Sequence, residues 1–198
     1  MTRLRQASAF SLVEVLVALT ILGMAGAALL LATEAAATAT DDALERTIAQ
    51  GVAQQYIDDC LGNRYVEAGV SPELPWLGRE NGEHAWPLKT ALFDDTDDFN
   101  GYESYPLRDS WAVALGQGDA QGSTRHPQFQ LRSDYFDRWF TRIRVHYVDA
   151  DQPAKNLPSG QTSGFRAVEV EVGRVLPNGS IRVLSQLRRV YSYVPSPS

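Results

Sequence analysis

The feature that most constrains this chain is an apolar run near its N-terminus, from Ala9 to Ala32. A run of this length can span a bilayer as a helix, which takes about 20 predominantly apolar residues. Its one charged residue is Glu14, and an isolated carboxylate in hydrocarbon costs about 2.5 kcal/mol or more. No Lys or Arg lies between Arg5 and Arg46, so a cationic partner for Glu14 must come from outside the run.

A short basic leader, the small residue Ala9 and then F-S-L-V-E-V-L-V-A-L-T-I-L open the chain. This pattern resembles the processing and assembly signal of type IV pilin-like proteins, the family of pilins and type II secretion pseudopilins. The resemblance implies that a prepilin peptidase cuts between Ala9 and Phe10 and methylates the new terminus at Phe10. It also implies that Glu14 pairs with the N-methylated terminus of a neighbouring subunit, which supplies the missing cation. The family usually has Gly before the cut, where this chain has Ala9.

Two other kinds of N-terminal segment fit less well. A secretory signal peptide has an apolar core of about 7 to 15 residues followed by its cleavage site, and the run here is longer. A signal anchor fits the length of the run but gives Glu14 no role. The arginines of the leader keep that end cytoplasmic by the positive-inside rule. We therefore expect a single-pass protein of the bacterial inner membrane, with its head domain in the periplasm.

Length and charge narrow the remaining possibilities. The 198 residues leave room for one soluble domain beyond the membrane segment. The formal net charge is -6, and it becomes -8 when the leader is removed with Arg3 and Arg5. Nucleic-acid binding needs clustered Lys and Arg, so we expect no nucleic-acid partner. The single cysteine, Cys60, excludes an intramolecular disulfide.

The order of segments predicts a leader at 1–9, a transmembrane and assembly helix at 10–32, an amphipathic continuation at 33–62 and a head domain at 63–198. Within the continuation, apolar residues recur every four positions, which is typical of a helix that packs one face on a sheet. The apolar stripe consists of Leu44, Ile48, Val52, Tyr56 and Cys60, flanked by Ile57 and Leu61. Leu61-Gly62-Asn63 is a plausible helix end, and the position of Cys60 on the stripe predicts a buried, unreactive thiol.

The C-terminal third predicts antiparallel strands because apolar and polar residues alternate. We expect strands at 139–148, 165–176 and 181 to about 194, the last two joined by a Pro177–Ser180 turn that contains Asn-Gly. Glu169 and Glu171 of the middle strand are expected to face arginines of the last, namely Arg182, Arg188 and Arg189. A long N-terminal helix on an antiparallel sheet makes the fold class α+β, which is also the fold that the pilin-like resemblance implies.

Residues 63–138 show no strong periodicity, and we expect a long excursion with short elements. Its middle holds F-D-D-T-D-D-F-N-G-Y, in which the candidate metal ligands are Asp94, Asp95, Asp97, Asp98 and Asn100. Ca²⁺ takes 6 to 8 oxygen ligands, and some pseudopilins bind calcium in a head-domain loop. The spacing of an EF-hand loop is not met. When Asp98, Asn100 and Gly101 are aligned to its third, fifth and sixth positions, Thr96 stands where the first Asp belongs and Leu107 where the bidentate Glu belongs. A calcium site and a solvated acidic turn with Asx caps are both open from the sequence.

The sequence carries no nucleophile, phosphate-binding or dinucleotide motif, and His84, His126 and His146 have no metal-ligand spacing. We therefore expect no enzymatic activity and no required cofactor. The favoured function is a structural subunit of a pilin-like filament, with prepilin peptidase and other pilin-like subunits as partners. V-E-V-L-V-A-L-T-I-L and A-L-E-R-T-I-A-Q-G-V-A-Q-Q-Y are similar to the I-type minor pseudopilins of type II secretion; a minor type IV pilin is also open. The alternative is a membrane-anchored periplasmic binding module for calcium or a carbohydrate.

Overall fold

A computed structural model describes residues 11–67, 69–80, 83 and 86–194. The chain divides into two compact units, Met1–Glu45 and Arg46–Ser198, which are treated separately below. One helix, α1 (Leu12–Gly62), contributes to both of them. Its bounds agree with the predicted helix, which was expected to end near Leu61.

The first unit consists of the N-terminal part of α1. It contains a stretch that is long and apolar enough to cross a membrane, and none of that stretch is buried. Its threonines satisfy their own hydroxyl groups: Thr20 and Thr33 donate to the carbonyls of Val17 and Leu30 at 2.7 and 2.8 Å. A helix with its polar side chains bonded to its own backbone exposes few unsatisfied groups, as a lipid environment requires.

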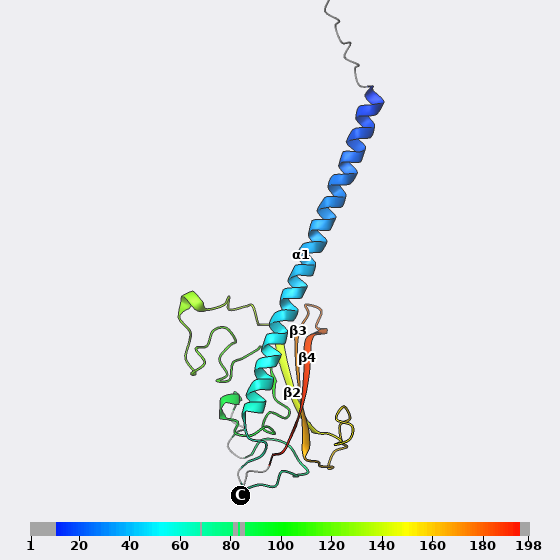
Figure 1. The fold of residues 1–198 in the computed structure, drawn as a ribbon. Coiled ribbons are helices and arrows are strands. Elements are labelled where there is room, and N and C mark those ends of the chain that lie inside the picture. Colours follow the sequence, from blue (N-terminus) through cyan, green and yellow to red (C-terminus); the bar gives the residue numbers. More distant parts are fainter. Residues whose placement is uncertain (1–10, 68, 81–82, 84–85, 195–198) are drawn as a thin grey trace, which may run out of the picture. The chain divides into compact units, whose positions relative to one another are not determined.

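The second unit combines the last turns of α1 with an antiparallel sheet, of which β2, β3 and β4 are labelled in Figure 1. The sheet has four strands in the order β1-β2-β3-β4. The strands are β1 (Glu103–Ser104), β2 (Trp139–Tyr147), β3 (Phe165–Val175) and β4 (Ile181–Ser192). The α+β fold and the three long strands are therefore confirmed. The short strand β1 was not predicted.

The core lies between α1 and one face of the sheet. Tyr56, Ile57 and Cys60 of the helix share one buried cluster with apolar residues of β2 and β3, which are Trp139, Ile143, Val145, Val168, Val170 and Val172. Ile48 and Val52 are partly buried against the same cluster. The apolar stripe predicted from the sequence is too long at both ends, because Leu44 and Leu61 are 54% and 39% exposed.

The other face of the sheet carries ion pairs, but only part of the predicted pairing occurs. Arg188 lies opposite Glu169, and their side chains are 2.9 Å apart. Arg189 lies opposite Val168 and Arg182 opposite Arg174, so neither faces a glutamate across the ladder. Arg189 directly follows Arg188 and so points to the opposite face of the sheet, whereas Arg182 lies closer to the hairpin turn than either glutamate.

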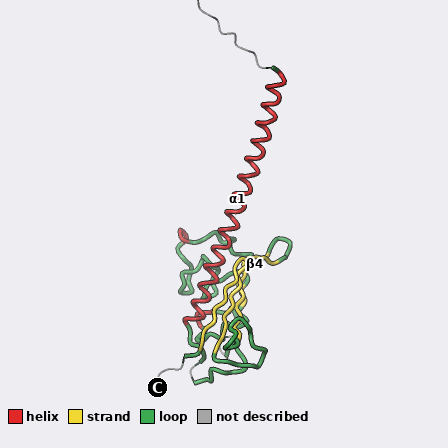
Figure 2. The backbone as a smooth tube through the Cα atoms, turned by 45° about the vertical axis from the view of Figure 1, so that its right-hand side comes forward, coloured by secondary structure: helices red, strands yellow, loops and turns green. Residues whose placement is uncertain are grey.

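Loops make up most of the chain between α1 and β2 (Figure 2). They include two short 3-10 helices, Thr90–Leu92 and Pro127–Phe129. Phe93, Phe99, Tyr102 and Leu107 from this excursion are buried in the same core as α1 and the sheet. The excursion is thus anchored by aromatic residues, and the acidic loop at 94–98 lies between two of these anchors.

Candidate functional site

The first candidate site is the start of α1. Ala9 and Phe10, the expected cleavage and methylation residues, lie outside the described residues. Glu14 lies in the first turn of the helix, and its backbone N–H donates to Ser11 Oγ at 3.2 Å. Ser11 and Glu14 therefore have the spacing of a capping box, in which the third helical residue is Glu or Gln. A carboxylate at this position also interacts favourably with the helix dipole.

The second candidate site is the acidic loop, which is buried rather than solvated. Asp95, Asp97 and Asp98 are 1%, 2% and 0% exposed, whereas Asp94 is exposed. Asp95 Oδ1 accepts hydrogen bonds from the backbone N–H groups of Asp97 and Asp98, at 2.8 and 3.3 Å. Asp98 Oδ2 in turn accepts from the N–H groups of Asp94 and Asp95, at 3.0 and 3.2 Å. Asx-type caps are thus present, and the expected solvation of the turn is wrong.

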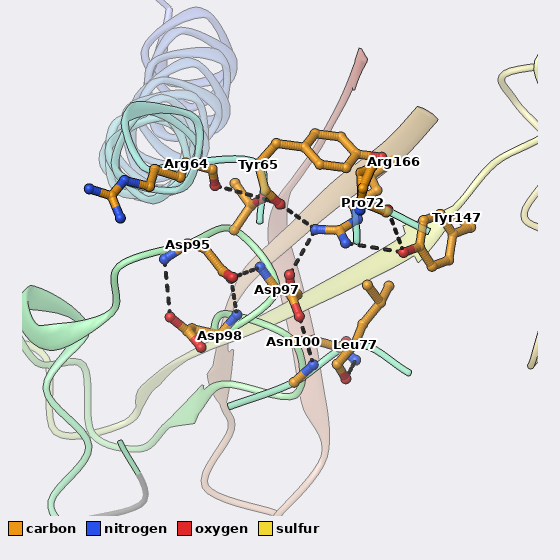
Figure 3. A network of polar contacts seen from close by, with 12 residues as sticks. Arg64, Tyr65, Pro72, Leu77, Asp95, Asp97, Asp98, Asn100, Tyr147 and Arg166 are labelled. Atoms are coloured by element: carbon orange, nitrogen blue, oxygen red, sulfur yellow. Dashed lines mark hydrogen bonds and ion pairs between the residues drawn. The ribbon is translucent and has the colours of Figure 1, made fainter. Parts of the chain in front are cut away.

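Asp97 has a long-range partner. Its Oδ1 lies 2.8 Å from Arg166 Nη1, and Arg166 at the start of β3 is fully buried (Figure 3). The same guanidinium donates to the carbonyl of Tyr65 and to Tyr147 Oη, and it stacks 4.2 Å from the centre of the Tyr65 ring. Hydrogen bonding to Tyr147 and the charge of Asp97 raise the pKa of Arg166 despite its burial. Arg166 therefore compensates Asp97 and joins the loop to β2 and β3.

Asn100, which was among the expected metal ligands, forms hydrogen bonds to the backbone through both its amide nitrogen and its amide oxygen. Its Nδ2 donates to the Leu77 carbonyl at 3.0 Å, and its Oδ1 accepts from the Val145 N–H at 3.1 Å. Asn100 therefore links the excursion to β2.

Two glutamates that the sequence did not single out come close to the acidic loop. Glu80, Glu83 and Asp98 form one group of carboxylates, and Glu80, Asp95 and Asp97 form another. Nothing in the R-E-N-G-E segment that contains both glutamates predicted this proximity, since it shows no periodicity and lies well before the loop.

The crowding of these carboxylates has an electrostatic consequence. Burial, followed by the negative charges of Asp97 and Asp98, raises the pKa of Asp95 to about 8. Burial and the neighbouring Asp98 raise the pKa of Glu83 to about 8 as well. Each shift reflects the difficulty of placing another negative charge in a site that already holds several.

The remaining candidates from the sequence were Cys60 and the three histidines. Cys60 is fully buried, and burial raises the pKa of its thiol, which confirms the expected buried position. His126 caps the 3-10 helix Pro127–Phe129 through Nδ1, and His146 lies within β2. His84 lies outside the described residues.

Comparison with known proteins adds one finding. A family model described as the prokaryotic N-terminal methylation motif matches residues 4–30. No curated protein and no solved structure matches the chain significantly. The chain therefore carries the prepilin signal of type IV pilin-like proteins, and this signal indicates a pilin-like subunit that is processed by prepilin peptidase.

Proposed function

From the N-terminal methylation motif at residues 4–30, we propose that this chain is a non-enzymatic structural subunit of a pilin-like filament. In finer detail it is a minor subunit, either a pseudopilin of a type II secretion system or a minor type IV pilin. It stands in the inner membrane as a single-pass protein with its head in the periplasm. The observation that carries the proposal is the motif together with Glu14, the one charged residue of an otherwise apolar run.

In the proposed mechanism, the negative charge of Glu14 on one subunit pairs with the positive terminus of another, and no reaction is catalysed. Cleavage between Ala9 and Phe10 creates a new amino group, and this group is the cation that the apolar run of a neighbouring subunit lacks. A Glu14 carboxylate left alone in hydrocarbon costs about 2.5 kcal/mol or more. Pairing it with the methylated Phe10 terminus of another subunit removes much of this cost, so assembly is favoured over isolation in the membrane.

The capping geometry suggests a sharp test. Glu14→Gln keeps a residue that completes a capping box but removes the charge, whereas Glu14→Ala removes both. We expect both variants to remain in the membrane and both to be lost from filaments, which is measured by shearing and blotting in a cell with the cognate assembly system. If Glu14→Gln assembles normally while Glu14→Ala does not, Glu14 acts only as a helix cap and the charge-matching mechanism is wrong.

The competing function is a membrane-anchored binding module. If the helix is only an anchor, Glu14→Gln and Glu14→Ala should both leave the protein functional. Processing is tested separately by the intact mass of the protein from membranes that contain a prepilin peptidase. We expect a chain that begins at methylated Phe10, and Ala9→Gly as the control should be processed at least as completely. A wild-type chain that retains residues 1–9 would contradict the proposal.

A further inference from the structure

Five carboxylates from two separate segments meet in the second unit. Glu80 and Glu83 come from the segment before the first 3-10 helix, and Asp95, Asp97 and Asp98 come from the acidic loop. In each of the two groups, one oxygen atom from every member lies within 4.8 Å of the others. Calcium binds oxygen at 2.3–2.6 Å, so two ligands on opposite sides of one ion are about 4.8 Å apart. Within each group, the spacing of the three oxygens fits the coordination shell of one ion, and Glu80 belongs to both groups.

A second observation points to the same site. Among the described residues, no hydrogen-bond donor lies on Asp95 Oδ2 or Asp98 Oδ1, although these two aspartates are 1% and 0% exposed. The other oxygen of each side chain is fixed by two backbone N–H groups. A buried carboxylate oxygen without a donor is costly, and a bound cation removes that cost.

Among the described residues, the carboxylates of the site outnumber the two arginines whose side chains are shown to contact the acidic loop. Arg166 pairs with Asp97, and Arg79 donates from Nη1 to the backbone carbonyl of Asp98 at 3.0 Å. These two guanidinium groups stand beside the five carboxylates, so negative charge remains in excess.

We propose that Glu80, Glu83 and Asp98, whose carboxylate oxygens lie together, bind one calcium ion, which joins the two glutamates to the acidic loop. Asp95, which forms the second group with Glu80, adds its charge beside the ion. Asp97 stays with Arg166 and contributes only its charge. The donor set consists of carboxylate oxygens, which suit hard cations rather than zinc or copper. The ligands come from irregular loops, and calcium tolerates such variable geometry, whereas magnesium requires a near-ideal octahedron and keeps several waters.

The test uses the full chain in detergent, with equilibrium dialysis against ⁴⁵Ca²⁺ and thermal unfolding in EGTA or CaCl₂. We expect about one ion per chain, and calcium at about 100 times its Kd should raise the Tm by about 5 to 10 °C. MgCl₂ at the same concentration should raise it much less. If 1 mM calcium neither binds nor raises the Tm of the wild-type chain, or if magnesium acts equally, the proposal is wrong.

Two variants test which residues bind the ion. Glu80→Gln combined with Glu83→Gln should weaken calcium binding by at least about 10-fold, because even second-shell changes at metal sites cost that much. Without calcium, this variant should unfold at or above the wild-type temperature, since it relieves repulsion. Asp94→Asn removes one charge from the same loop at an exposed position outside both groups, and binding should stay within about threefold. Unchanged affinity in the double variant would overturn the ligand assignment.

Discussion

Replacing Arg166 tests how strongly the acidic loop depends on its long-range partner. The guanidinium is 0% exposed, the Asp97 carboxylate is 2% exposed, and their closest atoms are 2.8 Å apart. Arg166→Met keeps most of the side-chain volume but leaves Asp97 as a buried charge without its cation. The Tyr65 carbonyl loses a donor in the same step.

The magnitude follows from burial. Removing one partner of a buried ion pair costs about 3–5 kcal/mol, because the remaining charge stays desolvated. In a chain of this size, 1 kcal/mol corresponds to about 2–4 °C, so the Tm of Arg166→Met should fall by about 6–20 °C. Combining it with Asp97→Asn should recover part of the loss, since the double variant buries no unpaired charge at this position.

The assay is thermal and urea unfolding of the full chain in detergent, in EGTA so that calcium does not contribute. The matched control is Arg144→Met, because Arg144 is 56% exposed and lies 3.8 Å from Glu103 on the charged face of the sheet. An exposed pair of this kind contributes about 0–1 kcal/mol. The reasoning is refuted if Arg166→Met stays within about 1 kcal/mol of wild type, or if the two changes at Arg166 and Asp97 are simply additive.

Two further predictions concern packing. Gly173→Ala should destabilise the protein by about 1–3 kcal/mol, because the new Cβ would lie 2.5 Å from the Arg182 carbonyl and 2.8 Å from the Phe140 ring. Gly51→Ala, on α1 with no atom within 4 Å of the new Cβ, should instead stabilise it by up to about 1 kcal/mol, and urea midpoints would compare the two. Cys60 should not react with a maleimide at pH 8 in the folded protein but should react after unfolding, because burial raises the pKa of its thiol. Rapid labelling of the folded chain, followed by mass spectrometry, would contradict that position of Cys60.

The helix and the long strands could be predicted because their buried apolar residues recur at a regular spacing in the sequence. The long apolar run and the four-residue spacing of Ile48, Val52 and Tyr56 predicted α1, and alternation predicted the three long strands. A period does not show how far the partner surface extends, which is why Leu44 was wrongly placed in the core. Nor does it identify Ala49 and Ala53, which are fully buried although a small residue alone gives no strong apolar signal.

The parts that could not be predicted depend on residues far apart in the chain. In the sequence, Arg166 resembles a surface residue of an alternating strand. In the structure it is buried and pairs with Asp97, which lies 69 positions earlier. Glu80 and Glu83 resemble residues of a polar loop, and only the folded chain brings them to Asp95 and Asp98. Local composition therefore located the cluster of aspartates but not its burial or its neighbours from other segments.

The two proposed charge pairings, at Glu14 and at the buried acidic loop, lie in different units and should act independently. Glu14 belongs to the first unit and, by the proposed mechanism, obtains its counter-charge from another subunit, so its contribution would exist only in the assembled filament. The loop belongs to the second unit and obtains its counter-charges from Arg166 and, by our proposal, from calcium, so its contribution exists in every folded head. Changes at Glu14 should therefore leave the calcium response intact, whereas changes at Glu80 and Glu83 should leave membrane insertion intact. A filament that needs calcium would then need it for the stability of the head rather than for the charge pair of the helix.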